Sequence, residues 1–123
     1  MAPVDSPEFG AIFAGCVLAA AGSLVAFIGR RGRQGRLPRQ HWAGIRTPST
    51  MRSDDAWRVA HRAGGMVMEV AGWIAAALGL LSVVLAPADL IGPEALPLVA
   101  AGVLLVGVSI GGVRGVRAAR RLN

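Results

Sequence analysis

The stretch that decides the fold covers residues 9–29, "FGAIFAGCVLAAAGSLVAFIG", and it contains no charged side chain. At about 1.5 Å of rise per residue, a helix of this length crosses the roughly 30 Å hydrocarbon layer of a bilayer. The whole chain has only 123 residues, of which 54% are apolar, and a soluble domain of this size is rarely so apolar. We therefore expect a membrane-spanning helix here and an integral membrane protein overall.

Two further apolar stretches complete a predicted all-α, three-helix membrane bundle. Residues 64–86, "GGMVMEVAGWIAAALGLLSVVLA", are interrupted by one acid, Glu69, and residues 95–113, "ALPLVAAGVLLVGVSIGGV", carry no charge. Pro97 is tolerated in the first turn of a helix, where its missing N–H has no intrahelical partner. The predicted layout is a single membrane domain, 1–123, with spans at 9–29, 64–86 and 95–113, a loop at 30–63, a tight hairpin at 87–97 and a basic tail at 114–123.

The charges predict the orientation of these spans. All 13 basic residues are arginines, nine of them in the 30–63 loop and four after residue 113. The N-terminal segment and the second connection instead carry acids, namely Asp5, Glu8, Asp89 and Glu94. Basic residues accumulate on the cytoplasmic side of membrane proteins. We expect the N-terminus outside and the C-terminus inside, with an Arg-rich cytoplasmic loop, in a multi-pass membrane protein.

Two other interpretations of the same features are disfavoured. A cleaved signal peptide carries its positive charges before the apolar stretch, whereas here acids precede residues 9–29 and arginines follow them. The pI of 11.6 is typical of nucleic-acid-binding proteins. However, an Arg-rich loop between two membrane helices is explained by topology and by attraction to anionic lipid head groups. We expect lipid head groups as partners and no nucleic acid.

The loop divides into two parts of different composition. Its first part, "RRGRQGRLPRQ" at residues 30–40, lacks apolar periodicity and is expected to lie irregularly across the head groups. In the second part, Gly44 and Pro48 favour turns, while Ser53 followed by two aspartates is the pattern that begins a helix. We expect a helix from about Asp54 that either runs straight into the second span or bends at residues 64–65.

Polar residues of this helix fall on one face. Trp57, His61, Gly65 and Glu69 are spaced at i, i+4, i+8 and i+12. An acid inside a span is costly and usually faces the bundle or a water-filled crevice. Glu69 is therefore predicted either to pair with Arg62 or His61, or to belong to a binding or proton-linked site inside the bundle. In the last span, the small-residue steps at Gly107, Gly111 and Gly115 favour close packing within the chain or in a dimer.

One segment resembles a known family. Residues 42–65, "WAGIRTPSTMRSDDAWRVAHRAGG", are similar to the segment Asn-x-x-(I/V)-G-(I/V)-R-(T/I)-P that recurs, with a following Trp and His-(R/K), in the SdpI family of small bacterial integral membrane proteins. His41 departs from this pattern, because family members often carry Asn near that point. The resemblance covers about residues 37–79 and implies a multi-pass protein of the bacterial plasma membrane. The residues that carry it are Gly44, Arg46, Thr47, Pro48, Thr50, Ser53, Trp57, His61, Arg62 and Gly64 or Gly65.

The resemblance implies a function. The best-known family member is longer, gives immunity against a secreted toxic peptide, and signals that toxin by holding a transcriptional repressor at the membrane. This chain resembles its C-terminal module, which implies a non-enzymatic protein that binds a peptide toxin within the bilayer and presents its basic loop. Two alternatives are a small accessory subunit of a larger membrane complex and a transporter-like module, which would need a second copy of the chain.

The motif itself is expected to supply shape rather than catalysis. "GIRTP" beside Trp57 and His61 would pack residues 41–62 under the bundle as an ordered cap. Arg46 would place its guanidinium on a lipid phosphate, on Asp54 or Asp55, or on carbonyls at a helix end. The chain has no Tyr, Lys, CxxC, HExxH, GxSxG or phosphate loop, so we expect no catalytic residue, metal or cofactor. Cys16 is expected to be a small packing residue.

Overall fold

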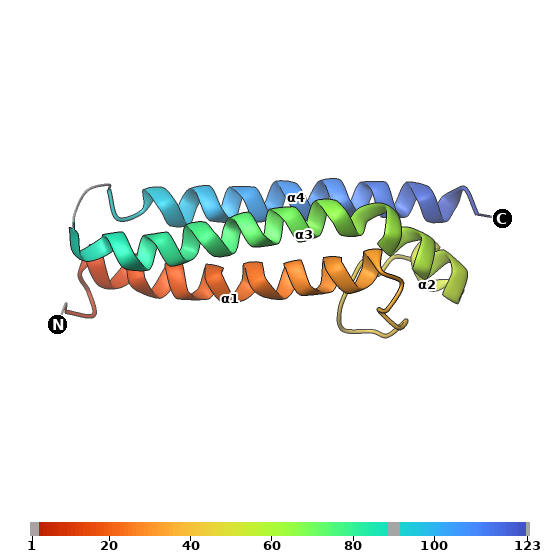
Figure 1. The fold of residues 1–123 in the computed structure, drawn as a ribbon, viewed down its shortest axis with the longest axis horizontal. Coiled ribbons are helices and arrows are strands. Elements are labelled where there is room, and N and C mark those ends of the chain that lie inside the picture. The colour runs from red at the N-terminus through yellow and green to blue at the C-terminus, as the bar shows by residue number, and fades with distance from the viewer. Residues whose placement is uncertain (1–2, 89–91, 123) are drawn as a thin grey trace.

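The computed structural model describes residues 3–88 and 92–122. This part of the chain is helical and contains, in order, α1 (Pro7–Arg33), α2 (Pro48–Met51), α3 (Asp54–Leu85), the 3-10 turn η1 (Ala86–Ala88) and α4 (Ala95–Arg120). The long helices α1, α3 and α4 lie side by side, with α2 and its loop at one end (Figure 1). Among the described residues, three helices are long and apolar enough to cross a membrane, and each contains one of the three predicted spans. We take residues 9–29, 64–86 and 95–113 as the membrane-spanning segments.

Helix α1 extends beyond its apolar stretch at the loop end. It begins with a capping hydroxyl, because Ser6 accepts a hydrogen bond from the Phe9 amide at 3.1 Å. It continues to Arg33, so the first residues of the segment that was predicted to be irregular are helical. Gly35 follows with φ of +74°, a conformation that glycine adopts without strain, and the chain turns away from the bundle.

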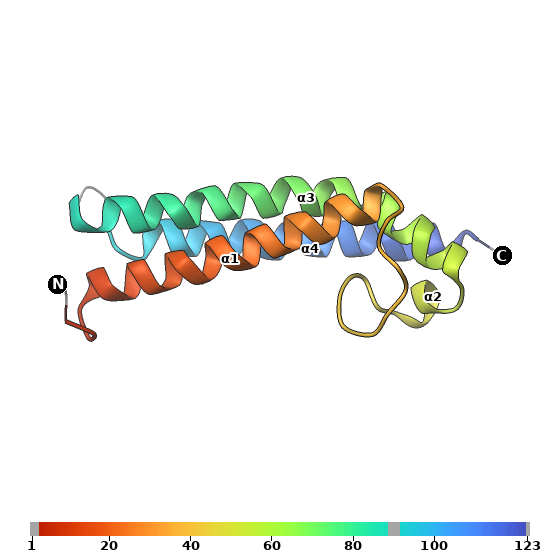
Figure 2. The same cartoon turned by 60° about the horizontal axis from the view of Figure 1, so that its bottom comes forward.

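Helix α3 begins where the sequence predicts. Ser53 caps it by accepting a hydrogen bond from the Ala56 amide at 3.0 Å, and Asp54 and Asp55 occupy the first turn. The helix is not interrupted at residues 64–65, so the first of the two predicted alternatives is observed. One helix therefore joins the loop end of the bundle to the opposite end (Figure 2).

Helix α4 contains Pro97 in its first turn, as expected, and runs to Arg120. Residues 114–120, which were predicted to be a basic tail, are therefore helical, and Gly115 and Ala119 in this part are buried. Asp89, one of the acids that predicted the orientation, lies outside the described residues, as does the middle of the hairpin predicted at 87–97.

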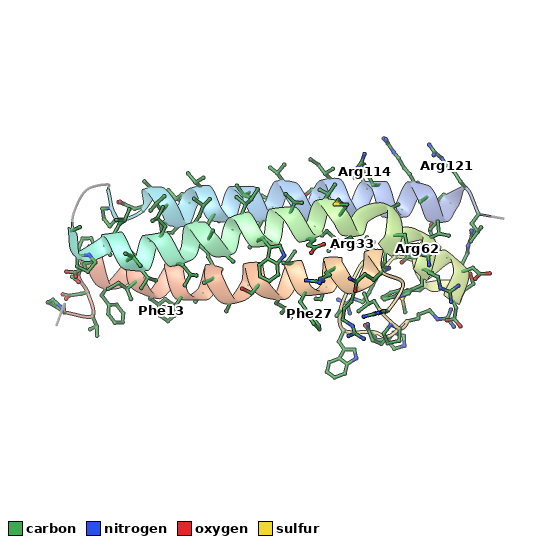
Figure 3. The ribbon with its side chains drawn as sticks, in the orientation of Figure 1. Phe13, Phe27, Arg33, Arg62, Arg114 and Arg121 are labelled. Carbon is green, nitrogen blue, oxygen red and sulfur yellow. The ribbon has the colours of Figure 1, made fainter. Side chains whose placement is uncertain are left out.

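The interior of the bundle is made of small residues. Helices α1 and α4 both pack chiefly against α3, and the fully buried apolar side chains at 0% exposure are alanines such as Ala26, Ala75 and Ala100. Large apolar side chains point outward, as lipid-facing residues do, and Figure 3 shows Phe13 and Phe27 directed away from the other helices. Cys16 is also exposed on α1, so its predicted packing role is wrong.

Candidate functional site at the capped end of the bundle

His61 is the centre of the cap. It is 2% exposed, and the Ile45 amide donates a hydrogen bond to its Nε2 at 2.8 Å, while its Nδ1 lies 2.8 Å from the Trp57 carbonyl oxygen. Because Nε2 accepts, the proton of the neutral ring must be on Nδ1. His61 precedes the membrane-spanning segment that starts at Gly64. Burial lowers the pKa of this imidazole, and the hydrogen bond to the Trp57 carbonyl offsets part of that effect.

Trp57 connects the cap to the segment that follows α1. Its indole Nε1 donates to the Leu37 carbonyl at 2.7 Å, and its ring lies against the His61 ring with centroids 4.1 Å apart. The side chain is 2% exposed, so it is a buried part of the cap. The other tryptophan near this end, Trp42, is 86% exposed and is free to contact solvent or lipid.

Gly44 allows the motif to approach His61. Its φ is +101°, and a Cβ at this position would lie 2.5 Å from His61 Nε2 and 3.1 Å from Trp57 Cη2. Both the backbone conformation and the lack of space therefore require glycine.

Ile45 is a functional candidate that the sequence analysis missed. It is buried, and its Cδ1 lies where α3 and α4 meet: a Cβ at Gly64 would be 3.2 Å from it, and a Cβ at Gly115 would be 2.6 Å from it. The sequence signal was a large aliphatic side chain, flanked by Gly44 and Arg46, in a loop rich in arginine. The junction of α3 and α4 buries this apolar side chain, which removes its surface from water.

The threonines of the motif hold Ile45 in place. Thr47 and Thr50 form a reciprocal capping box at the start of α2, with Pro48 as its first residue. The buried Thr50 hydroxyl also donates to the Ile45 carbonyl at 2.6 Å. The predicted packing of "GIRTP" beside Trp57 and His61 is therefore observed in atomic detail.

The arginines of the motif are peripheral. Arg46 is exposed and donates to the His41 carbonyl, so its partner is a loop carbonyl rather than Asp54, Asp55 or a helix end. The aspartates have other partners: Arg39 Nε is 3.2 Å from Asp54, and Arg58 is 3.2 Å from Asp55.

Arg62 is exposed and lies over the turn that follows α1. A Cβ at Gly35 would be 3.1 Å from its Nη2. Arg62 therefore contacts the loop rather than the interior of the bundle.

Glu69 forms an ion pair with Arg33, the last residue of α1. The predicted partners Arg62 and His61 are wrong: Arg62 points to the turn at Gly35, and both ring nitrogens of His61 are engaged elsewhere. The predicted face itself is confirmed, because Trp57, His61, Gly65 and Glu69 are all buried. The carboxylate faces α1, whose final turn supplies a long side chain that reaches back to it.

Glycines make the helix contacts on both sides of α3. The predicted residues Gly107, Gly111 and Gly115 face α3 within the same chain, where a Cβ at Gly111 would lie 2.6 Å from Met68 Cγ and one at Gly115 would lie 2.9 Å from the Ala60 carbonyl oxygen. A second set of glycines lies between α1 and α3 and was not predicted from the sequence, although its members are spaced by seven residues in each helix. Its members are Gly15, Gly22 and Gly29 on α1 and Gly65, Gly72 and Gly79 on α3.

The fold and the cap define a class: a multi-pass helical membrane protein with an ordered motif folded under one end of its bundle. Comparison with known protein families assigns the chain to one family within this class. The SdpI/YfhL protein family matches residues 36–113, which is more than half of the chain, and the chain belongs to this family. No curated protein and no solved structure gave a match. The matched range contains the cap, α3 and most of α4.

The described residues were compared for clusters of side chains that could ligate a metal ion. Over residues 3–88 and 92–122, no three His, Cys, Asp or Glu side chains come together in a way that could hold an ion.

Proposed function

We propose that this protein protects its cell against a membrane-active peptide, by binding the peptide within the bilayer, and reports the peptide through its basic loop without any enzymatic step. Membership of the SdpI/YfhL family supports this proposal, because the resemblance implies immunity and signalling. The geometry adds a place for the peptide and a way for the loop to respond.

The proposed place is an apolar groove between α3 and α4. It has a volume of about 560 Å³, opens toward the lipid, and is lined by Met66, Val70 and Ile74 on α3 and by Gly102, Val103 and Val106 on α4. A hydrophobic peptide helix would lay its apolar side chains in such a groove. Gly102 lets the peptide approach the backbone of α4, because a Cβ there would meet nothing within 4 Å.

The observation that carries the proposal is the position of Ile45. Its side chain packs at the junction of the same two helices that form the groove, and its amide is bonded to His61. A peptide that changes the separation of α3 and α4 therefore changes the contacts of Ile45. A ligand shifts a conformational equilibrium only through such differential contacts.

The proposed orientation places the cap in the cytoplasm. All 13 arginines lie after residue 29 of α1, in the loop and cap, or in the last turns of α4, and these parts share one end of the bundle (Figure 1). Single cysteines in a Cys16→Ala background test this. An impermeant thiol reagent on intact cells should label Val4→Cys and Ala88→Cys but not His41→Cys, and the reverse pattern would contradict the orientation.

A pair of glycine variants tests the function. Gly102 lines the groove, whereas Gly112 lies on the same helix outside it, and a Cβ at either position meets nothing within 4 Å. Cells that lack the gene are complemented with wild type, Gly102→Leu or Gly112→Leu at matched membrane levels and challenged with secreted peptides from neighbouring strains. We expect Gly102→Leu to lose protection by filling the groove and Gly112→Leu to keep it.

Two outcomes would overturn the proposal. Equal protection by the two variants would exclude the groove as the binding place. If deletion changes no peptide sensitivity and the wild type purifies in fixed ratio with a larger membrane complex, the accessory-subunit alternative replaces immunity.

A further inference from the structure

A second pocket lies at the capped end of the bundle, beside the end of α1. It has a volume of about 520 Å³, and its charged lining consists of Arg31, Arg36, Arg39 and Arg58 with the single carboxylate Asp54. None of these residues belongs to the groove between α3 and α4. The pocket therefore calls for a ligand of different chemistry from a hydrophobic peptide.

Specific hydrogen bonds shape this pocket. Trp57, which lines it, donates through Nε1 to the Leu37 carbonyl and so holds the loop segment against α3. Arg31 Nη2 donates to the Arg36 carbonyl at 3.1 Å and holds the turn that follows α1. The walls are thus an ordered part of the cap.

The charge of the pocket is positive after its internal ion pairs are considered. Arg39 Nε is 3.2 Å from Asp54, and Arg58 is 3.2 Å from Asp55. Both pairs are exposed and hold their arginines only weakly. Arg31 and Arg36 add two guanidinium groups for which the lining offers no further carboxylate. Guanidinium groups match the oxygens of phosphate with paired hydrogen bonds, so the pocket suits a phosphate group.

The depth of the pocket in the membrane identifies the source of that phosphate. The Arg31 guanidinium lies 5.6 Å from the centre of the Phe27 ring, and Phe27 is 53% exposed on the lipid-facing side of α1 (Figure 3). The apolar stretch of α1 ends at Gly29, between these two residues. The pocket therefore begins at head-group level, and lipid acyl chains beside Phe27 would bring a phosphate to its mouth.

We propose that this pocket binds the phosphate head group of one anionic phospholipid, from the leaflet that faces the cap. The lipid phosphate bridges the α1 side of the pocket, at Arg31 and Arg36, and the α3 side, at Arg58. This site is independent of the proposed peptide groove, and either can exist without the other.

Native mass spectrometry of the detergent-purified protein tests the site. The probes are dioleoyl phosphatidylglycerol, dioleoyl phosphatidylcholine and inorganic phosphate. The test variant is Arg36→Gln/Arg58→Gln. The control is Arg114→Gln/Arg121→Gln, which removes the same charge from α4 and from the residue that follows it, where both side chains point away from the cap (Figure 3). We expect one phosphatidylglycerol to bind the wild type, with affinity reduced on the order of tenfold in the test variant and within about twofold in the control.

Several results would overturn this proposal. Equal losses in the two double variants would indicate general attraction to charge, and equal binding of phosphatidylcholine would remove the role of lipid charge. Full competition by an equal concentration of inorganic phosphate would make the ligand a soluble phosphate. Circular dichroism checks the fold of each variant, and Arg36→Gln alone, a change at an exposed loop residue, keeps the test decisive if the double variant unfolds.

Discussion

The two helix interfaces of α3 are built differently, although both depend on glycine. Against α1, glycines face each other in reciprocal pairs: a Cβ at Gly15 would lie 2.6 Å from the Gly79 carbonyl oxygen, and one at Gly79 would lie 2.6 Å from that of Gly15. Gly22 with Gly72 repeats this arrangement one heptad further along. Backbone meets backbone at each of these pairs, so neither helix can move closer to the other there without a clash.

Against α4, backbone approaches backbone near the cap, where Gly64 faces Gly111 and Gly115 faces the Ala60 carbonyl, but side chains also enter the contacts. Gly107 faces the methyl group of Ala71, and Gly111 faces the flexible side chain of Met68. The apolar groove opens in this interface, and Ile45 lies outside the groove, near the cap, at Gly64 and Gly115. The Met68 side chain can change rotamer, whereas a packed backbone cannot. Three reciprocal glycine pairs hold α1 to α3, whereas one holds α4 to α3. We therefore treat α1 and α3 as the rigid pair and expect a response to a ligand where α4 meets α3.

The largest effect should come from breaking the rigid pair. A Cβ at Gly72 would lie 2.5 Å from the Ala26 amide nitrogen and 2.5 Å from the Gly22 carbonyl oxygen. Gly72→Leu must separate the two helices, and we expect a loss of roughly 3 kcal/mol or more of stability. Thermal unfolding in mild detergent measures it, with Gly102→Leu as the control that should unfold like the wild type. Equal unfolding midpoints for the two variants would contradict a close α1–α3 contact.

The next effect concerns the ion pair that joins α1 to α3. Arg33→Ala leaves the Glu69 carboxylate buried without its partner, so we expect a lower unfolding midpoint than for Glu69→Gln, which removes the charge and keeps the shape. Arg33→Leu/Glu69→Leu should recover most of the loss, because neither charge remains. The same unfolding assay on Arg33→Leu and Glu69→Leu alone completes the cycle. Additive effects of the two leucine substitutions would show that the pair makes no energetic contribution.

A smaller effect is expected at the interface with α4. Gly107→Ala brings a methyl group against that of Ala71, which is fixed by its backbone, so the helices must shift locally, and we expect a loss of roughly 2 kcal/mol. Ala71→Gly in the same protein should restore stability by moving the methyl group from one helix to the other. If the second substitution lowers the unfolding midpoint further, the two positions are not in contact.

The smallest effect should be confined to the cap and should depend on pH. The pKa of His61 is lowered from its ordinary value of 6.5, so the unfolded chain binds a proton more readily than the folded cap. The stability that neutral His61 contributes is complete above pH 6.5 and is lost as the pH falls through the lower pKa of the folded state. Protonation at Nε2 also removes the acceptor of the Ile45 amide.

Trp57 fluorescence in a Trp42→Phe/Trp73→Phe background reports this change. We expect the emission to shift to the red as the pH falls from 7.5 to 5, because the indole next to His61 gains solvent. His61→Gln should abolish the pH dependence, whereas His41→Gln, a change at the exposed histidine of the loop, should leave it intact. A shift that survives in His61→Gln would assign the titration to another group.

Some features of the site could be predicted from the sequence because they depend on neighbours within a helix or a turn. Ser53 before Asp54 predicted the start of α3, and the four-residue spacing of Trp57, His61, Gly65 and Glu69 predicted their common face. The partner of Glu69 could not be predicted in this way, because Arg33 is 36 residues away and is reached only when α1 packs on α3. Ile45 was missed for the same reason, since its contacts belong to α3 and α4.

The sequence by itself determined that the chain has three apolar segments of membrane length, that its arginines gather beyond their ends, and that the motif at residues 42–65 belongs to the SdpI/YfhL family. Transfer of a side chain into hydrocarbon and capping of a helix are local properties, and composition and spacing express them directly. Only the tertiary structure decided which glycines face each other, which arginine meets Glu69, and where Ile45 and the four pocket arginines lie. Those arrangements depend on how closely two backbones approach, and small residues permit close approach on several faces of a helix, so the choice among faces is made by the packing of the whole bundle.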